Sequence, residues 1–243
     1  MSPNPAEACV EMIAVAYASG EDGKLTLSVN EVTLLRDHVG GMAGFVPPNL
    51  LLEGDNTVTV QFTGAGGAKA EVFKGCMGEF PKDPGENDNV LVSVALTAAG
   101  SKTVTFAQSG LPAYSYIAAE PADDAGLREA IAAFIDTARN RDVEGYLAYL
   151  DPMLHDFALD DPQAPEMLRE TATYVIGGPF EVVDPGALTV APVLGGRAYQ
   201  VTDSAGKPPL QFTTPGDSGG PSDALSQAGI WMKTADGWKV LRH

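Results

Sequence analysis

Two cysteines carry the simplest chemistry available to this chain. Cys9 and Cys76 lie in the same half of a sequence of 243 residues, where they could join an early strand to a later one as a disulfide. Such a bond closes a long loop, contributes about 4 kcal/mol by the chain-entropy estimate, and is typical of exported proteins. The alternative is two buried free thiols. The sequence has no Cys-x-x-Cys motif and no Cys/His cluster, so it predicts no metal site.

A serine lies in the motif Gly216-Asp217-Ser218-Gly219-Gly220-Pro221. This hexapeptide resembles the surroundings of the nucleophilic serine in chymotrypsin-like proteases, where a histidine accepts the serine proton and an aspartate orients that histidine. His38 and Asp88 precede Ser218 in the required order, but the context of His38, Arg-Asp-His-Val-Gly-Gly, differs from that family's Ala-Ala-His-Cys. Only 25 residues follow Ser218, too few for the rest of a protease pocket. We therefore interpret the motif as a polar loop.

Charge excludes two classes of partner. The chain has 15 basic and 32 acidic residues, a net charge of −17, which repels nucleic acid and anionic lipid surfaces. No apolar run approaches the roughly 20 residues of a transmembrane helix, so we expect no membrane insertion. The first eight residues are too polar for a signal peptide. We expect an exported protein, periplasmic or secreted, whose leader is absent from this sequence.

The first half of the chain carries signals of strands and turns only. Apolar and polar residues alternate in several short segments, which predicts an antiparallel β-sandwich of about seven strands; residues 37–48, rich in Gly and Pro, are predicted to form a loop. Leu51 to Val58 resembles a pattern, l-x-x-G-x-N-x-v, seen at strand entries of many carbohydrate-associated and accessory β-sandwiches. A Gly and an Asn at a turn also need no function.

Helical periodicity begins in the second half. Apolar residues recur at i, i+3, i+4 and i+7 over residues 123–139, which predicts an amphipathic helix on a core. Asp123 or Asp124 is expected to cap this helix, and Asn140 with Asp142 marks its end and the start of a second helix. A third helix is predicted from Pro165 to Gly177. The change of period places the domain boundary between residues 119 and 120, giving a β-sandwich domain of 1–119 and an α+β domain of 120–243.

The second half resembles the NTF2-like (SnoaL-like) superfamily. The resemblance lies in Arg139, Asp142, Leu150 and Pro152, which match its R-x-x-D and L-x-P motifs, and in residues 229–243, which look like its last two strands around an Asp236-Gly237 turn. It implies a cone of three helices on a curved antiparallel sheet, with a cavity between them. Further strands are predicted at 180–183, 187–193, 198–201 and 210–213. In one departure, no strand is predicted between the second and third helices.

The resemblance also supplies candidate site residues. In NTF2-like enzymes a His or Asp in the cavity often moves a proton and aromatic side chains exclude water; the weak catalytic candidates here are His155 and Asp156. Further candidates for the cavity wall are Tyr146, Tyr149, Tyr174, Tyr199, Trp231 and His243. The alternatives are that His155 caps a helix and that Tyr146 and Trp231 are core residues. Phe134 is expected to face Trp231, unless the strand has the opposite parity and Ile230 and Met232 point inward.

Two classes of function remain. The first is a non-catalytic binding or protein-interaction role, as an accessory or immunity-type factor, which the lack of a catalytic constellation favours. The second is a small-molecule enzyme, an isomerase, dehydratase or hydrolase that uses the cavity. We expect no cofactor and no metal; the partner would be a protein or a small hydrophobic ligand, and a homodimer is an option. A filled interior with an exposed apolar patch would favour binding.

Overall fold

The chain forms an α+β structure that divides into two compact units, Met1–Leu111 and Pro112–His243. The computed structural model describes residues 11–20, 22–46, 50–76, 81–213 and 227–242, with the side chains of 42–45 left out. The boundary predicted from periodicity, after residue 119, falls inside the opening segment of the second unit, because Tyr114 and Ser115 are hydrogen-bonded to that unit's Asp160 and Asp156.

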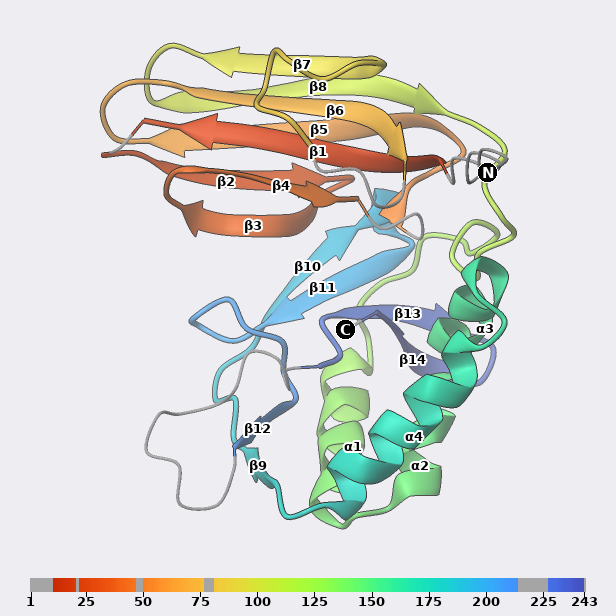
Figure 1. Ribbon diagram of the computed structural model, residues 1–243. Coiled ribbons are helices and arrows are strands. Elements are labelled where there is room, and N and C mark those ends of the chain that lie inside the picture. The colour runs from red at the N-terminus through yellow and green to blue at the C-terminus, as the bar shows by residue number, and fades with distance from the viewer. Residues whose placement is uncertain (1–10, 21, 47–49, 77–80, 214–226, 243) are drawn as a thin grey trace, which may run out of the picture. The chain divides into compact units, whose positions relative to one another are not determined.

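The first unit consists of two four-stranded antiparallel sheets (Figure 1). One has the order β4 (Gly41–Phe45), β1 (Glu11–Ser19), β6 (Ala68–Cys76), β7 (Val90–Leu96), and the other β3 (Val32–His38), β2 (Lys24–Val29), β5 (Gly54–Thr63), β8 (Gly100–Gln108). Alternate residues of both sheets, such as Val15, Leu27, Val60 and Val72, bury themselves in one shared core. This is the period-two pattern on which the strand prediction rested.

One strand of this unit was missed. The predicted loop 37–48 contains β4, whose backbone pairs with β1 in the register Ala16↔Ala43 and Ala18↔Gly41. The sequence of β4, Gly-Met-Ala-Gly-Phe, has no alternation and is rich in glycine, so it carries no strand signal of its own. Its place is set by the partner strand, and the unit has eight strands among its described residues.

Two buried asparagines hold the turns of the second sheet. Asn30 and Glu31 join β2 to β3 in a two-residue turn with φ of 48° and 66°, a conformation that asparagine tolerates well. The Asn30 side-chain Nδ2 donates to the Leu50 carbonyl at 2.8 Å and to Asn56 Oδ1 at 2.7 Å. Asn56 in turn donates to the carbonyls of Leu52 and Gly54 and accepts from the Leu52 amide at 2.7 Å. The Gly and Asn of residues 51–58 therefore have a structural role.

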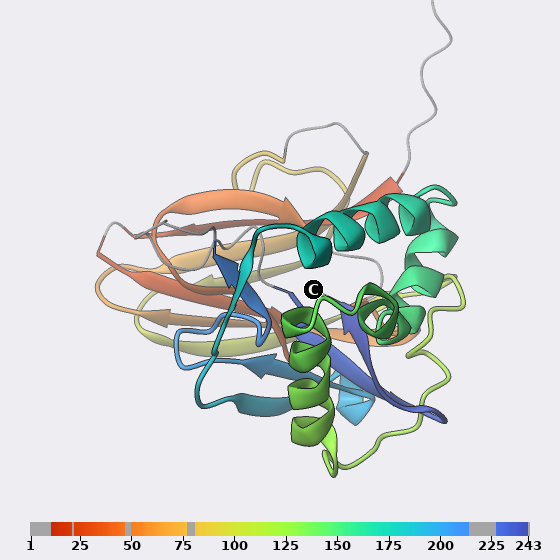
Figure 2. The same ribbon diagram turned by 90° about the horizontal axis from the view of Figure 1, so that it is seen from below.

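The second unit combines four helices with antiparallel strands. The helices are α1 (Leu127–Arg139), α2 (Val143–Ala148), α3 (Asp151–Asp160) and α4 (Ala164–Gly177); the strands are β10 (Thr189–Val193), β11 (Ala198–Thr202), β13 (Ile230–Thr234) and β14 (Gly237–Arg242) in one sheet, and β9 (Glu181–Val183) with β12 (Gln211–Thr213) in a two-stranded one. In Figure 2, α1, α2 and α4 lie toward the viewer and the four-stranded sheet lies behind them. One core joins helices and strands.

The helices differ from the prediction in number and in one cap. Residues 151–160, for which no helix was predicted, form α3, which has Pro152 in its first turn and buries Met153, Leu154 and Asp156. Helix α1 begins after Gly126, with φ of 78°, and no side chain caps it, so the expected caps Asp123 and Asp124 are wrong. Asp142 does cap α2, since its Oδ1 accepts from the Gly145 amide at 2.9 Å. The buried face of α1 is the predicted stripe, centred on Ile131 and Phe134.

Candidate functional site

The interior of the second unit is built by aromatic rings. Phe134 of α1 stacks on Tyr146 of α2 with ring centroids 4.9 Å apart and meets Tyr149 edge-on at 5.3 Å. Trp231 of β13 contacts the same Phe134 at 5.4 Å with an interplanar angle of 87°, and Tyr149 at 6.1 Å. Edge-to-face rings at these distances are in direct contact. The expectation that Phe134 faces Trp231 is confirmed.

The polar atoms of these rings are satisfied within the core. The Trp231 indole donates to the Ala228 carbonyl at 2.7 Å, and the Tyr146 hydroxyl donates to Gln227 Oε1. Burial raises the pKa of Tyr146, which keeps this phenol neutral. Tyr146 and Trp231 are each 0% exposed. We conclude that both side chains act in packing.

Tyr199 belongs to the same core. It pairs directly with Trp231 across β11 and β13, packs edge-on against Trp238 at 5.6 Å and donates its hydroxyl to the Ala122 carbonyl at 2.6 Å. The structure thus brings together four of the five predicted binding residues, Tyr146, Tyr149, Tyr199 and Trp231. Ile230 and Met232 are also buried but are not members of the core that contains α1, so the alternative strand parity is wrong.

His155 and Asp156, the two catalytic candidates, do not share a site. They are neighbours on α3, where successive side chains point about 100° apart; His155 is exposed and Asp156 is 0% exposed. Asp156 Oδ1 accepts two hydrogen bonds from Ser115, from the amide at 2.8 Å and from Oγ at 2.7 Å. Its Oδ2 has no hydrogen-bond partner among the described residues. Burial raises the pKa of this carboxyl, and the Ser115 bonds oppose the rise.

Asp156 is one of two carboxylates of α3 that bind the segment at Tyr114 and Ser115. One turn further along α3, Asp160 accepts a 2.5 Å hydrogen bond from the hydroxyl of Tyr114, which burial and this bond hold in its neutral form by raising its pKa. Desolvation lowers the pKa of the nearby Arg242 to about 10, and the charge of Asp160 works against that fall. Tyr114 and Tyr116 are fully buried and stack at 6.1 Å. These hydrogen bonds attach Tyr114 and Ser115, at the start of the turn at residues 115–118, to α3.

Sequence reasoning missed this cluster. Ser115 and Tyr114 precede Asp156 and Asp160 by more than forty positions, and nothing in their own spacing points to α3. The only local signal was an acid at an apolar position of α3, and α3 itself was not predicted. Because the chemistry of the cluster is fixed by contacts distant in sequence, it becomes visible only in the folded unit.

Tyr174, the fifth predicted binding residue, lies on an exposed face of α4. It is 67% exposed and packs only edge-on against Phe180 among the described aromatic contacts, at 5.8 Å. Met167, seven residues earlier and therefore on the same helix face, is 55% exposed. The exposed Glu170 and Thr171 lie between them on that face. We call Met167, Glu170, Thr171 and Tyr174 the α4 face.

Several predicted residues fall outside the described chain. These are Cys9, His243 and residues 216–221 with Ser218, so the proposed disulfide and the serine loop remain predictions. Cys76 is described: it ends β6, where it pairs with Glu11, two positions after Cys9 in the sequence. Within the described residues, no three His, Cys, Asp or Glu side chains are grouped as a metal site would require. No helix in that part of the chain has the length and apolarity needed to span a membrane.

No match to this chain was found among protein families, curated proteins or solved structures.

Proposed function

We propose that this chain is an exported, non-catalytic binding protein, built from an N-terminal β-sandwich and a C-terminal NTF2-like cone whose interior is closed by its own side chains. One observation supports this most directly: Phe134 contacts both Tyr146 and Trp231 where a cavity enzyme would hold its substrate. The two residues that could move protons diverge, since His155 is exposed and Asp156 is buried against Ser115. Proximity of the acid and base is a condition for their joint catalysis.

The α4 face is the proposed contact surface. Met167 and Tyr174 are 55% and 67% exposed, two turns apart on one side of α4, and Met and Tyr are both enriched in protein interfaces. Glu170 adds a negative charge to the face, and the whole chain carries −17. Charge complementarity then selects a protein partner with an apolar centre and a basic rim.

Site-specific photo-cross-linking tests this proposal. In cells that express the protein, Tyr174→p-benzoylphenylalanine is expected to give one defined adduct on irradiation, whereas Thr173→p-benzoylphenylalanine, exposed one position along α4 on another side, gives none. Adding Met167→Lys should abolish the adduct. The purified partner should bind the wild-type chain more weakly as salt rises. Equal cross-linking at 173 and 174 would refute the α4 face, and an adduct between two copies of this chain would assign it to a homodimer instead.

A second candidate, a small-molecule isomerase, dehydratase or hydrolase, is favoured by one feature. The buried carboxyl of Asp156, with its raised pKa and one unpartnered oxygen, is the kind of group that such enzymes use. An enzyme of this type needs an open interior. In the Trp238→Phe variant, acrylamide should therefore quench the emission of Trp231 only weakly if the interior is closed; quenching close to that of free tryptophan would favour the enzyme.

A further inference from the structure

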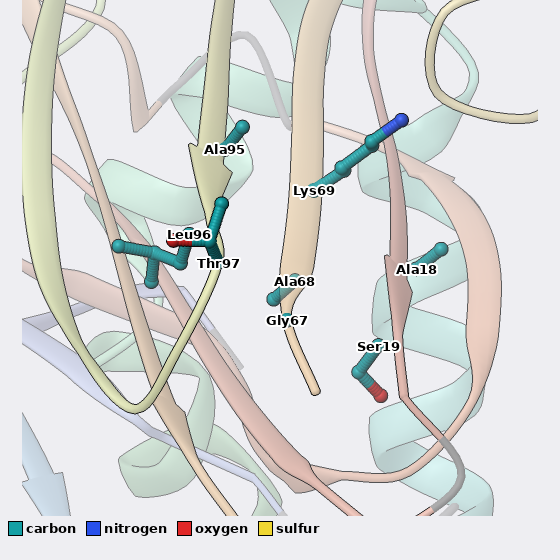
Figure 3. Close-up of a pocket in the computed structure, with 8 residues that line it drawn as sticks. All are labelled: Ala18, Ser19, Gly67, Ala68, Lys69, Ala95, Leu96 and Thr97. Atoms are coloured by element: carbon teal, nitrogen blue, oxygen red, sulfur yellow. The ribbon is translucent and has the colours of Figure 1, made fainter. Parts of the chain in front are cut away.

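A pocket of about 430 Å³ lies in the first unit where β1 and β7 end and β6 begins (Figure 3). Ala18 and Ser19 line it from β1, Ala68 and Lys69 from β6, and Ala95 and Leu96 from β7. Its volume lies in the range of small-molecule sites. None of these residues contributes to the α4 face or to the core of the second unit.

Short side chains and one glycine keep this pocket open. At Gly67 a Cβ atom would lie 2.3 Å from the Leu96 carbonyl oxygen and 3.3 Å from the Thr97 Cα atom, so no other residue fits there without a backbone shift. Ala18, Lys69 and Ala95 are direct neighbours across the three strands, in the registers Ala18↔Lys69 and Lys69↔Ala95. The lysine therefore has only methyl groups beside it in its row. Its side chain extends from β6 towards β1 in Figure 3.

The rim of the pocket is held in place by hydrogen bonds. The Ser19 hydroxyl donates to the Gly40 carbonyl and accepts from the Gly40 amide, both at 3.1 Å, and the Gly20 amide donates to the Gly67 carbonyl at 3.0 Å. These bonds use the hydroxyl of Ser19 within the fold. A rim fixed in this way loses little conformational entropy when a ligand binds.

Lys69 supplies the charge of the site. None of the ion pairs given by the described residues includes it, whereas Lys74 and Lys82 are paired with Glu11 and Asp88. Glu71 lies two positions further along β6, on the same face as Lys69, and is buried. Its two carboxylate oxygens accept hydrogen bonds from Asn87 and Ser93. An exposed ammonium beside an apolar hollow attracts an anion that has an apolar body.

We propose that this pocket binds a free small-molecule monocarboxylate with a compact hydrocarbon body, the hydrocarbon on Ala18, Ala95 and Leu96 and the carboxylate at the ammonium of Lys69. A single negative charge suits the site, because a second one would be repelled by a chain of net charge −17. Burial of the hydrocarbon supplies binding free energy in proportion to the apolar area removed from water. The carboxylate provides selectivity over uncharged molecules with the same hydrocarbon body.

Titration of the full-length chain with octanoate, followed by ¹H–¹⁵N correlation spectra, tests the proposal. Octanoate is expected to shift the amide signals of Ala18, Ala68 and Ala95 and to bind more tightly than octanamide, which has the same body without the charge. Lys69→Gln should weaken octanoate binding about threefold, the scale of an exposed ion pair, and leave octanamide binding unchanged. Lys102→Gln, at an exposed lysine of β8, is the matched control and should bind octanoate like the wild type.

Filling the pocket gives an independent readout. Ala95→Leu places a larger side chain at an exposed strand position and should abolish binding of both ligands, while dispersed spectra show that the variant is folded. Equal affinity for octanoate and octanamide, or no effect of Lys69→Gln, would overturn the proposal. Tighter binding of an N-acetylated dipeptide with a free C-terminal leucine would assign the site to peptide ends instead. Cross-linking at Tyr174 does not depend on this pocket, so the two proposals can fail separately.

Discussion

The rings of Phe134 and Trp231 meet edge-on at 5.4 Å, one from the centre of α1 and the other from β13. This contact joins the helical and sheet layers of the second unit through two side chains that are each 0% exposed. The free energy of unfolding and the emission of Trp231 should therefore both respond to a change at this contact.

Phe134→Ala is expected to lower the free energy of unfolding by about 3–5 kcal/mol, the usual loss for a large-to-small change in a core. Because the substitution opens space beside Trp231, the emission of that tryptophan should shift to the red. The measurement is urea unfolding and emission in a Trp238→Phe background, which isolates Trp231. Ala133→Gly on the exposed side of α1 controls for helix propensity, with an expected loss of about 1 kcal/mol. A loss no larger than that of the control would place Phe134 outside the core.

Asp156→Asn should change how stability depends on pH. Burial raises the folded-state pKa of Asp156 above the unfolded value of 3.8, so the folded chain holds this proton more tightly than the unfolded chain. The stabilisation that this carboxyl contributes to the folded state is complete below the unfolded-state pKa. It decreases as pH rises through that value towards the folded-state pKa. Asn cannot ionise, so the variant should gain stability relative to the wild type between pH 3 and pH 7, as measured by urea unfolding.

Asp203→Asn is the matched comparison, because the pKa of Asp203 is shifted in the opposite direction to that of Asp156. Burial alone would raise the pKa of Asp203, but hydrogen bonds from Gln211 and from the amides of Lys207 and Ala205 outweigh it and lower the pKa. Above the unfolded-state pKa of Asp203, the wild type should therefore have a larger free energy of unfolding than Asp203→Asn. This difference should disappear as pH falls through the folded-state pKa. Parallel pH profiles for the two variants would contradict both assignments.

Asn56→Ala should destabilise the first unit strongly. It removes the acceptor of the Leu52 amide and of the Asn30 side chain, as well as the donor to two carbonyls. Each buried group left unpaired costs about 1–3 kcal/mol. Thr63→Ala, at an exposed position of the same strand, should stay within about 0.5 kcal/mol of the wild type in denaturant unfolding. A mild effect of Asn56→Ala would mean that water replaces these contacts.

Thiol counting tests the predicted disulfide. Cys76 pairs in register with Glu11, which follows Cys9 by two positions in the sequence. Denatured, unreduced protein is expected to show no free thiol and reduced protein two. Reduction should also lower the free energy of unfolding by about 4 kcal/mol. Two titratable thiols before reduction would remove the main support for export.

Periodicity predicted those parts of the fold in which each residue's burial follows from its position. The stripe of α1 and its contact with Trp231 are of this kind, as are the strands with strict alternation, such as β5. Periodicity failed where neighbouring elements decide the structure. The backbone of β1 holds the glycine-rich β4, and α3 combines an early proline with a buried acid, which weakens its amphipathic signal.

The candidate site was less predictable than the fold, for a physical reason. The resemblance to the NTF2-like superfamily predicted that Tyr146, Tyr199 and Trp231 line one cavity, and the structure places all three in one core. The sequence could not distinguish a ring that lines a cavity from one that fills it, because that depends on the closeness of opposite walls. The partner of Asp156 was equally hidden, as Ser115 lies in a turn with no periodic pattern.

The aromatic core of the second unit also determines where a new binding site could arise. Trp231 is the largest of its fully buried side chains, and its neighbours Phe134 and Tyr149 present aromatic carbon to it. A cavity with such walls excludes water and accepts an apolar guest. Trp231→Gly would therefore create a vacancy with the outline of indole, destabilising by about 3–5 kcal/mol, and added indole should restore part of that stability by mass action. A single substitution would turn this packed aromatic core into a host for a flat aromatic molecule.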